Sequence, residues 1–136
     1  MGYSVDKCGF IQLPKIHDPR GNLTFIQNDL CGFQIRRIYY LYDIPAESER
    51  GGHAHKALQQ LIIPLSGSFD ILIDDGEKKR TLTMSKPYQG LYICPMIWRE
   101  LKNFSSGAVC LALASEEYDE SDYFRDYTDF LNARKK

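Results

Sequence analysis

Arg50-Gly51-Gly52-His53-Ala54-His55-Lys56 is the stretch from which the rest of the sequence is best understood. Side chains alternate along a β-strand, so His53 and His55 are expected to project together from one wall of a sheet. The two glycines allow a tight turn or a close approach of the backbone to a ligand. Arg50 adds a charged, forked donor that suits phosphate. The stretch predicts a pocket with two imidazoles and an anion-binding arginine, although an HxH pair also occurs on solvated edges.

Short β-rich runs separated by turn residues extend along most of the chain, which predicts an all-β sandwich or barrel rather than alternating strands and helices. We expect strands at residues 23–26, 35–42, 58–65, 69–73, 80–84, 91–94, 98–104 and 108–114. Residues 18–22 have turn composition, residues 28–32 break the first strand, and the Asp75-Gly76 pair predicts a hairpin. After Glu116 the chain becomes acidic and aromatic, and a short helix is expected over residues 126–135.

The strand expected at residues 35–42 carries polar groups on both faces. Alternation places Arg37, Tyr39 and Leu41 on one face. The opposite face then carries Arg36, Ile38, Tyr40 and Tyr42. An inner face with Arg and Tyr suits a wet pocket, although tyrosine also sits in cores with only its hydroxyl hydrogen-bonded.

The totals indicate one domain spanning residues 1–136. Seventeen basic and eighteen acidic residues leave a net charge of −1, which gives no general basic field for nucleic acid. The longest apolar runs are shorter than the roughly 18 residues of a membrane span. The four cysteines form no CxxC pair, and we expect a cytoplasmic protein with reduced thiols.

An HxH pair on a barrel wall raises the question of a cupin metal site, in which a glutamate and a third histidine complete the ligands. Here Gln60 stands where the carboxylate belongs, and the expected histidine region reads Trp98-Arg99-Glu100. A neutral amide is a poor replacement for a carboxylate, and a guanidinium repels a cation. We therefore expect no tightly bound metal and no cofactor, which leaves both imidazoles free to act as acid and base.

Five motifs in register resemble the sugar 3,4-ketoisomerases, small metal-free cupins that act on dTDP-4-keto-6-deoxyglucose. They are Arg36-Arg37-Ile38-Tyr39-Tyr40, Arg50 to Lys56, Gly90-Leu91-Tyr92-Ile93, Trp98-Arg99-Glu100 and the segment from Ala114 to Tyr123. The resemblance implies a jelly-roll homodimer with strands exchanged between subunits and a dTDP-linked 4-keto-6-deoxy sugar as substrate. It also implies a cytoplasmic role in making 3-amino-3,6-dideoxy sugars for O-antigen and other surface glycans.

The same resemblance assigns catalytic roles. The family's base matches His53, its neighbouring histidine matches His55 and its pocket tyrosine matches Tyr39. We expect His53 to move the C3 proton to C4 while His55 and Tyr39 handle protons on O3 and O4. Gln60, at the cupin carboxylate position, is expected to face the substrate.

Four arginines complete the expected substrate site. Arg37 and Arg50 are assigned to the pyrophosphate, because guanidinium groups bind phosphate bidentately and the chain has no glycine-rich nucleotide loop. Arg20 and Arg99 match two positions that the family associates with the configuration left at C4. One family type pairs arginine with histidine there and the other pairs tyrosine with arginine, so this chain is a hybrid and both product configurations stay open.

Three other functions are compatible with parts of the sequence. A dTDP-sugar 3,5-epimerase shares the barrel and a histidine base but usually pairs that histidine with an acid. A metal-dependent cupin enzyme would carry bound metal. A non-catalytic sugar-binding cupin would bind ligand without turnover. Thymine needs an aromatic or apolar platform, for which the nine Tyr and seven Phe residues offer many candidates.

Overall fold

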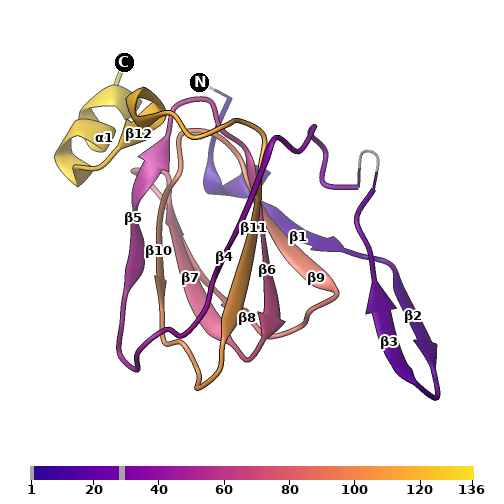
Figure 1. Cartoon of the computed structure of the whole chain (residues 1–136). Coiled ribbons are helices and arrows are strands. Elements are labelled where there is room, and N and C mark those ends of the chain that lie inside the picture. The colour runs from indigo at the N-terminus through magenta and orange to yellow at the C-terminus, as the bar shows by residue number, and fades with distance from the viewer. Residues whose placement is uncertain (1, 28–29) are drawn as a thin grey trace.

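Two antiparallel β-sheets face each other in the computed structural model, which describes residues 2–27 and 30–136 (Figure 1). The first sheet has the strand order β1 (Gly9–Gln12), β9 (Gln89–Ile93), β6 (Gln60–Ser66), β11 (Val109–Ala114) and β4 (Arg37–Leu41). The second has the order β12 (Tyr123–Phe124), β5 (Arg50–His55), β10 (Trp98–Lys102), β7 (Phe69–Asp74) and β8 (Lys79–Met84). The expected all-β cupin-type jelly roll is confirmed.

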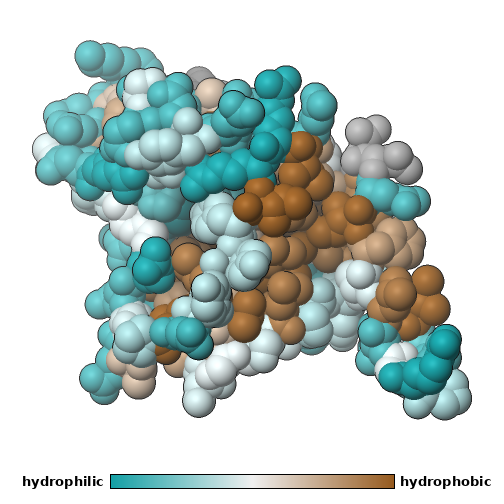
Figure 2. Space-filling model, in the orientation of Figure 1, coloured by the Kyte–Doolittle hydropathy of each residue, from teal (hydrophilic) through white to brown (hydrophobic). Residues whose placement is uncertain are grey.

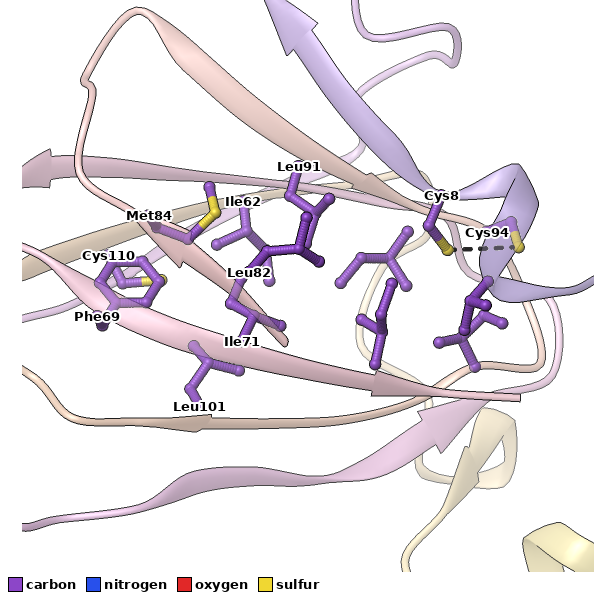
Figure 3. Close-up of a cluster of buried hydrophobic side chains, with 14 of the residues drawn as sticks. Cys8, Ile62, Phe69, Ile71, Leu82, Met84, Leu91, Cys94, Leu101 and Cys110 are labelled. Atoms are coloured by element: carbon purple, nitrogen blue, oxygen red, sulfur yellow. Dashed lines mark hydrogen bonds between the residues drawn. The ribbon is translucent and has the colours of Figure 1, made fainter. Parts of the chain in front are cut away.

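Apolar side chains fill the space between the sheets on the side of β7, β8 and β9 (Figure 3). Every second residue of these strands points inward, as Ile71 and Ile73 do from β7 and Leu82 and Met84 do from β8. Burial of these side chains supplies most of the driving force for closing the two sheets on each other. The opposite side of the sandwich, between β4 and β5, contains the cavity described below.

The hairpin expected at Asp75 and Gly76 is confirmed between β7 and β8. Gly76 has a φ of +93°, a conformation that favours glycine. The buried Asp75 carboxylate accepts hydrogen bonds from the backbone N–H groups of Glu77 and Lys78, both at 2.8 Å, and of Val5 at 2.9 Å. One aspartate therefore shapes the turn and ties the N-terminal segment to it.

The expected strands are all present, with ends that differ from the observed ones by no more than two residues. The turn at residues 18–22 joins β2 (Lys15–Asp18) and β3 (Gly21–Thr24), which form a separate hairpin that projects from the sandwich (Figure 1). The sequence did not predict β1 and β2, because both are four-residue strands with little apolar alternation. Of the break expected at residues 28–32, residues 28 and 29 lie outside the described part of the chain.

The segment after β11 folds back over one end of the second sheet (Figure 1). It contains the 3-10 turn η2 (Glu120–Asp122), strand β12 and helix α1 (Tyr127–Arg134), which agrees with the helix expected over residues 126–135. A second 3-10 turn, η1 (Val5–Lys7), precedes β1. Phe130 of α1 is buried against Trp98 and fixes the helix to the sandwich. No helix in the described residues is long and apolar enough to cross a membrane.

Candidate active site

His53 and His55 lie on the inner face of β5 with their ring centroids 4.9 Å apart and their planes nearly perpendicular. His53 lines a cavity of about 320 Å³ between β4 and β5, and His55 is 1% exposed. Gly51, two residues earlier, has a φ of +95°, and a Cβ there would stand 3.0 Å from the Leu101 side chain. The glycine is therefore needed both for its conformation and for the close packing of β5 on β10.

Burial changes the acid–base properties of both histidines from those expected of the sequence. Burial, followed by the positive charge of Arg99, lowers the pKa of His53 to about 3 and that of His55 to about 2. Both rings are therefore neutral at physiological pH, each with one nitrogen lone pair, and in the free enzyme they are weaker bases than an exposed imidazole. Nε2 of His53 is buried and has no hydrogen-bond partner in the described part of the chain. That nitrogen can therefore form a hydrogen bond to a ligand or exchange a proton with it.

Tyr39, Gln60 and Arg99 form a hydrogen-bonded chain across the cavity wall. Nε2 of Gln60 donates to the Tyr39 hydroxyl at 2.8 Å, and Nη1 of Arg99 donates to Oε1 of Gln60 at 2.7 Å. Burial raises the pKa of Tyr39, so its hydroxyl keeps its proton at neutral pH. These residues come from β4 and β6 of the first sheet and β10 of the second, so the chain of bonds links the two sheets.

Arg99 is a buried cation without a carboxylate partner among residues 2–27 and 30–136. The residue is 1% exposed, and its Nε and Nη2 atoms donate to the carbonyl of Ile97 at 3.3 and 3.0 Å. Burial lowers the pKa of Arg99, but a guanidinium remains protonated in proteins. A buried positive charge is costly unless a negative charge comes to it. The site therefore favours a ligand or an intermediate that carries negative charge.

Arg37 and Arg50 both line the cavity, as the sequence predicts for an anion site. The Arg37 guanidinium lies 4.8 Å from the ring centre of Tyr39 and 5.4 Å from that of Tyr118, which orients it by cation–π contacts. Neither arginine forms an ion pair with any acidic side chain of the described residues. Both remain available to a phosphate group.

Three residues of the segment after β11 belong to the site and were not assigned by the sequence. Tyr123 lines the cavity, and its ring centre lies 5.2 Å from that of His53 and 4.4 Å from that of His55. Arg125 stacks on Tyr123 at 4.1 Å. Asp122 hydrogen-bonds to His55. The acidic and aromatic composition of this segment was the available signal, but it does not say which residues turn inward.

Arg20 lies away from this cavity, in the turn of the β2–β3 hairpin. Its side chain is 90% exposed and is ion-paired with Asp18 at 2.7 Å. The structure thus brings His53, His55, Tyr39, Gln60, Arg37, Arg50 and Arg99 together within one chain. It does not bring Arg20 to them.

Gln60 and Arg99, the two residues expected from the sequence at cupin ligand positions, are hydrogen-bonded to each other. No group of three or more His, Cys, Asp or Glu side chains suited to a metal ion was found in the described residues. The absence of a metal remains a prediction that rests on the chemistry of these two donors.

Comparison with known proteins identifies the family. The family model described as WxcM-like, C-terminal (FdtA) matches residues 6–135. The chain is 44% identical over 121 residues to the TDP-4-oxo-6-deoxy-alpha-D-glucose-3,4-oxoisomerase of Aneurinibacillus thermoaerophilus, covering 88% of this chain and 87% of that protein. The chain belongs to the sugar 3,4-ketoisomerase family.

Solved structures of ketoisomerases have the same fold. One is an H-to-N mutant of the 3,4-ketoisomerase QdtA from Thermoanaerobacterium thermosaccharolyticum in complex with TDP-4-keto-6-deoxyglucose, with a TM-score of 0.92, 37% identity and 94% of each chain covered. Another is the TDP-quinovose 3,4-ketoisomerase WlaRB from Campylobacter jejuni, with a TM-score of 0.88, 43% identity, and 93% of this chain and 98% of that chain covered. The enzyme class of the family is therefore that of the TDP-sugar 3,4-ketoisomerases, not of the rival functions.

Proposed function

We propose that this ketoisomerase converts dTDP-4-keto-6-deoxy-D-glucose to a dTDP-3-keto-6-deoxyhexose. The proposal rests on two residues that line the same cavity. His53 is neutral and its Nε2 has no hydrogen-bond partner among the described residues, and Arg99 is buried without a carboxylate partner among them. A base beside a fixed positive charge is what the removal of a proton next to a ketone requires.

The reaction needs only proton transfers. His53 removes the proton from C3, and the electrons of that C–H bond form a C3–C4 double bond as the C4 carbonyl becomes an enediolate oxygen. The charge of Arg99 and the hydroxyl of Tyr39 stabilise that oxygen. His53 then returns its proton to C4 while the O3 hydroxyl loses its own, which leaves a carbonyl at C3 and a hydroxyl at C4. His55 and Tyr39 handle the protons on the two oxygens.

Arg37 and Arg50 bind the diphosphate in this proposal. Both line the cavity, neither has an acidic partner among the described residues, and Arg37 is oriented by two aromatic rings. Forked guanidinium groups match phosphate oxygens bidentately. The nucleotide would then extend from the cavity mouth while the sugar enters toward His53.

We also propose a homodimer with exchanged strands, in which the β2–β3 hairpin packs on a second copy. Ile16 and Leu23 of the hairpin are 54% and 55% exposed, and Ile38 and Leu65 on the outer face of the first sheet are 60% and 48% exposed. Figure 2 shows hydrophobic residues gathered over this sheet next to the hairpin. A groove of about 630 Å³ separates the two. Exchange would cover these surfaces and carry Arg20 to the partner's cavity.

The biological setting follows from the substrate. We propose that residues 1–136 act as one domain in the cytoplasm, with no nucleic-acid or membrane partner, and supply the 3-keto precursor of 3-amino-3,6-dideoxy sugars for surface glycans. All four cysteines are buried and free, which suits a reducing compartment.

The test is NMR of dTDP-4-keto-6-deoxyglucose incubated with EDTA-treated protein in D₂O, with a 3-aminotransferase present to trap the 3-keto product. A 3-amino sugar is expected, and its couplings at C4 give the configuration that the Arg20 and Arg99 pair produces. Deuterium at C3 or C5 without a 3-amino product would instead indicate a 3,5-epimerase. Loss of turnover on EDTA treatment, restored by a divalent metal, would indicate a metal enzyme.

A further inference from the structure

Asp122 is the one acidic side chain that contacts either histidine of the site among the described residues. Its Oδ2 lies 3.1 Å from Nδ1 of His55, and the two side chains are 15% and 2% exposed. Asp122 is 67 residues away in the sequence and reaches β5 from the end of η2. The contact is therefore made by the fold and not by the local sequence.

This contact fixes where the neutral His55 ring carries its proton. The ring has one N–H and one lone pair, and a carboxylate only accepts hydrogen bonds. Because the partner of Nδ1 is a carboxylate, the proton sits on Nδ1 and the lone pair on Nε2. Without that partner the proton could occupy either nitrogen.

The same carboxylate ties the segment after β11 to the strand that bears the histidines. Oδ1 accepts from the backbone N–H of Ala57 at 2.8 Å, and Oδ2 is 3.3 Å from the N–H of Leu58. The next residue, Tyr123, pairs with His55 across the short β12–β5 ladder and lines the cavity. Asp122 thus sets the proton position of His55 and the place of the wall beside it.

We propose that Asp122 is a positioning residue for the isomerase reaction, which holds His55 as its Nδ1–H tautomer with Nε2 as the proton acceptor. The inference rests on the proposed function, since it assigns a protonation pattern to a histidine of that site. Asp122 acts through His55, so it should govern turnover much more than substrate binding.

The Asp122→Asn variant tests this sharply because the amide has one acceptor and one donor end. Its oxygen can keep the bond to the Ala57 N–H, which turns the NH₂ group toward Nδ1 of His55. That donor demands a lone pair on Nδ1, so the proton should move to Nε2. Partners that orient metal-bound histidines typically contribute about 10- to 100-fold to affinity or activity, and we take the same range for this orienting carboxylate. We expect kcat to fall by that factor, with KM changed less than about twofold.

Asp119→Asn is the matched control. Asp119 caps η2 by accepting from the Ser121 N–H, contacts no histidine, and asparagine caps as well as aspartate. We expect this variant to keep wild-type kcat. An equal loss of kcat in both variants would show that the segment as a whole matters and would overturn the role of Asp122.

The ¹⁵N chemical shifts of the His55 ring give a reading that does not depend on turnover. We expect a protonated Nδ1 and an unprotonated Nε2 in the wild-type enzyme, and the reverse in Asp122→Asn. A wild-type His55 protonated on Nε2 would overturn the inference even if the enzyme is active or the variant fails to fold. If the wild type does not isomerise the 4-keto sugar, the proposed function fails and the shifts still decide the tautomer.

Discussion

Nη1 of Arg99 donates to Oε1 of Gln60 at 2.7 Å, and this bond determines which way the Gln60 amide faces. A guanidinium has no acceptor, so the amide oxygen must face Arg99 and the NH₂ group must face Tyr39. The Tyr39 oxygen therefore accepts from Gln60 at 2.8 Å and keeps its own proton for a ligand. Through Gln60, the buried Arg99 therefore leaves the Tyr39 hydroxyl free to donate a hydrogen bond to a ligand.

Gln60→Glu should reverse this arrangement at nearly constant shape. The new carboxylate would pair with Arg99 and accept a hydrogen bond from the Tyr39 hydroxyl, which removes both the uncompensated positive charge and the free donor. Loss of one donor to a developing oxyanion costs about 10² to 10³ in kcat. We expect a fall of at least about 10²-fold in steady-state assays.

Gln59→Glu is the control for that change. Gln59 is the adjacent residue, and its Oε1 accepts from the Tyr92 hydroxyl at 2.7 Å, a bond that a carboxylate also makes. This variant should keep wild-type kcat. Full activity of Gln60→Glu would show that the Tyr39 proton is not used.

His53→Asn should lose turnover while it still binds nucleotide. A positioned base contributes about 10² to 10⁴ in rate, and kcat should fall within that range. The amide cannot take the C3 proton, so exchange of that proton with D₂O, followed by NMR, should disappear as well. Affinity for dTDP, measured by calorimetry, should stay near the wild-type value because Arg37 and Arg50 are intact. Undiminished exchange in the variant would remove His53 from the role of base.

Substitution of Arg37 and Arg50 together by glutamine should raise KM. Hydrogen bonds to a charged group contribute about 1.5–3 kcal/mol each, which corresponds to roughly a 10- to 100-fold weaker binding per arginine lost. Arg36→Gln is the control, since the exposed Arg36 precedes β4 and does not line the cavity. A KM for the double variant equal to that of Arg36→Gln would exclude the diphosphate assignment.

Stability should decrease as the pH falls below about 6.5. The folded-state pKa values of His53 and His55, about 3 and about 2, lie below the ordinary value of about 6.5, so the unfolded chain binds more protons in that interval. The stabilisation is complete above pH 6.5 and is lost progressively as the pH falls toward 3. Urea unfolding between pH 6.5 and 5 measures the slope, which should be shallower in His53→Asn. Equal slopes in the two proteins would mean that His53 titrates normally.

Exchanged strands predict complementation between two defective chains. Arg20→Ala removes the residue that a subunit would lend, and His53→Asn removes one that it keeps. In a heterodimer, the Arg20→Ala chain retains its own His53 and receives Arg20 from its partner, so one of the two sites is complete. Coexpressed and purified heterodimers should form product with the wild-type configuration at C4 at up to about half of the wild-type rate, which is the activity compared below. A heterodimer no more active than the average of the two parent dimers would contradict delivery of Arg20 by the partner.

The elements that could be predicted from sequence are those with a clear period. Strand β4 alternates strictly, so the sequence correctly placed Arg37 and Tyr39 on one face and Ile38 and Tyr40 on the other, while the structure shows that the second face is the exposed one. The two histidines of β5 came together for the same reason. Turn chemistry located the β7–β8 hairpin.

The features that were missed depend on contacts between distant parts of the chain. Strand β12 has only two residues and therefore no period, and its place is set by bonds from Asp122 to the backbone after β5. The low pKa values of His53 and His55 arise from burial and from Arg99, neither of which is visible in the HxH pattern. Arg20 was expected in the pocket, but its hairpin extends away from its own chain's cavity.

The cavity wall formed by Tyr123 and Arg125 has a consequence for the order of biosynthesis. Ribosomes make the chain from its N-terminus, so every strand that pairs within the sandwich core is complete before these residues emerge. In a chain that lacks the residues after Ala114, all the strands of the first sheet are present, but the cavity has no Tyr123 and Arg125 wall and His55 has no carboxylate partner. We expect catalytic activity to appear only when the residues after Ala114 fold over the cavity. A chain that ends at Ala114 should therefore fold into an inactive barrel.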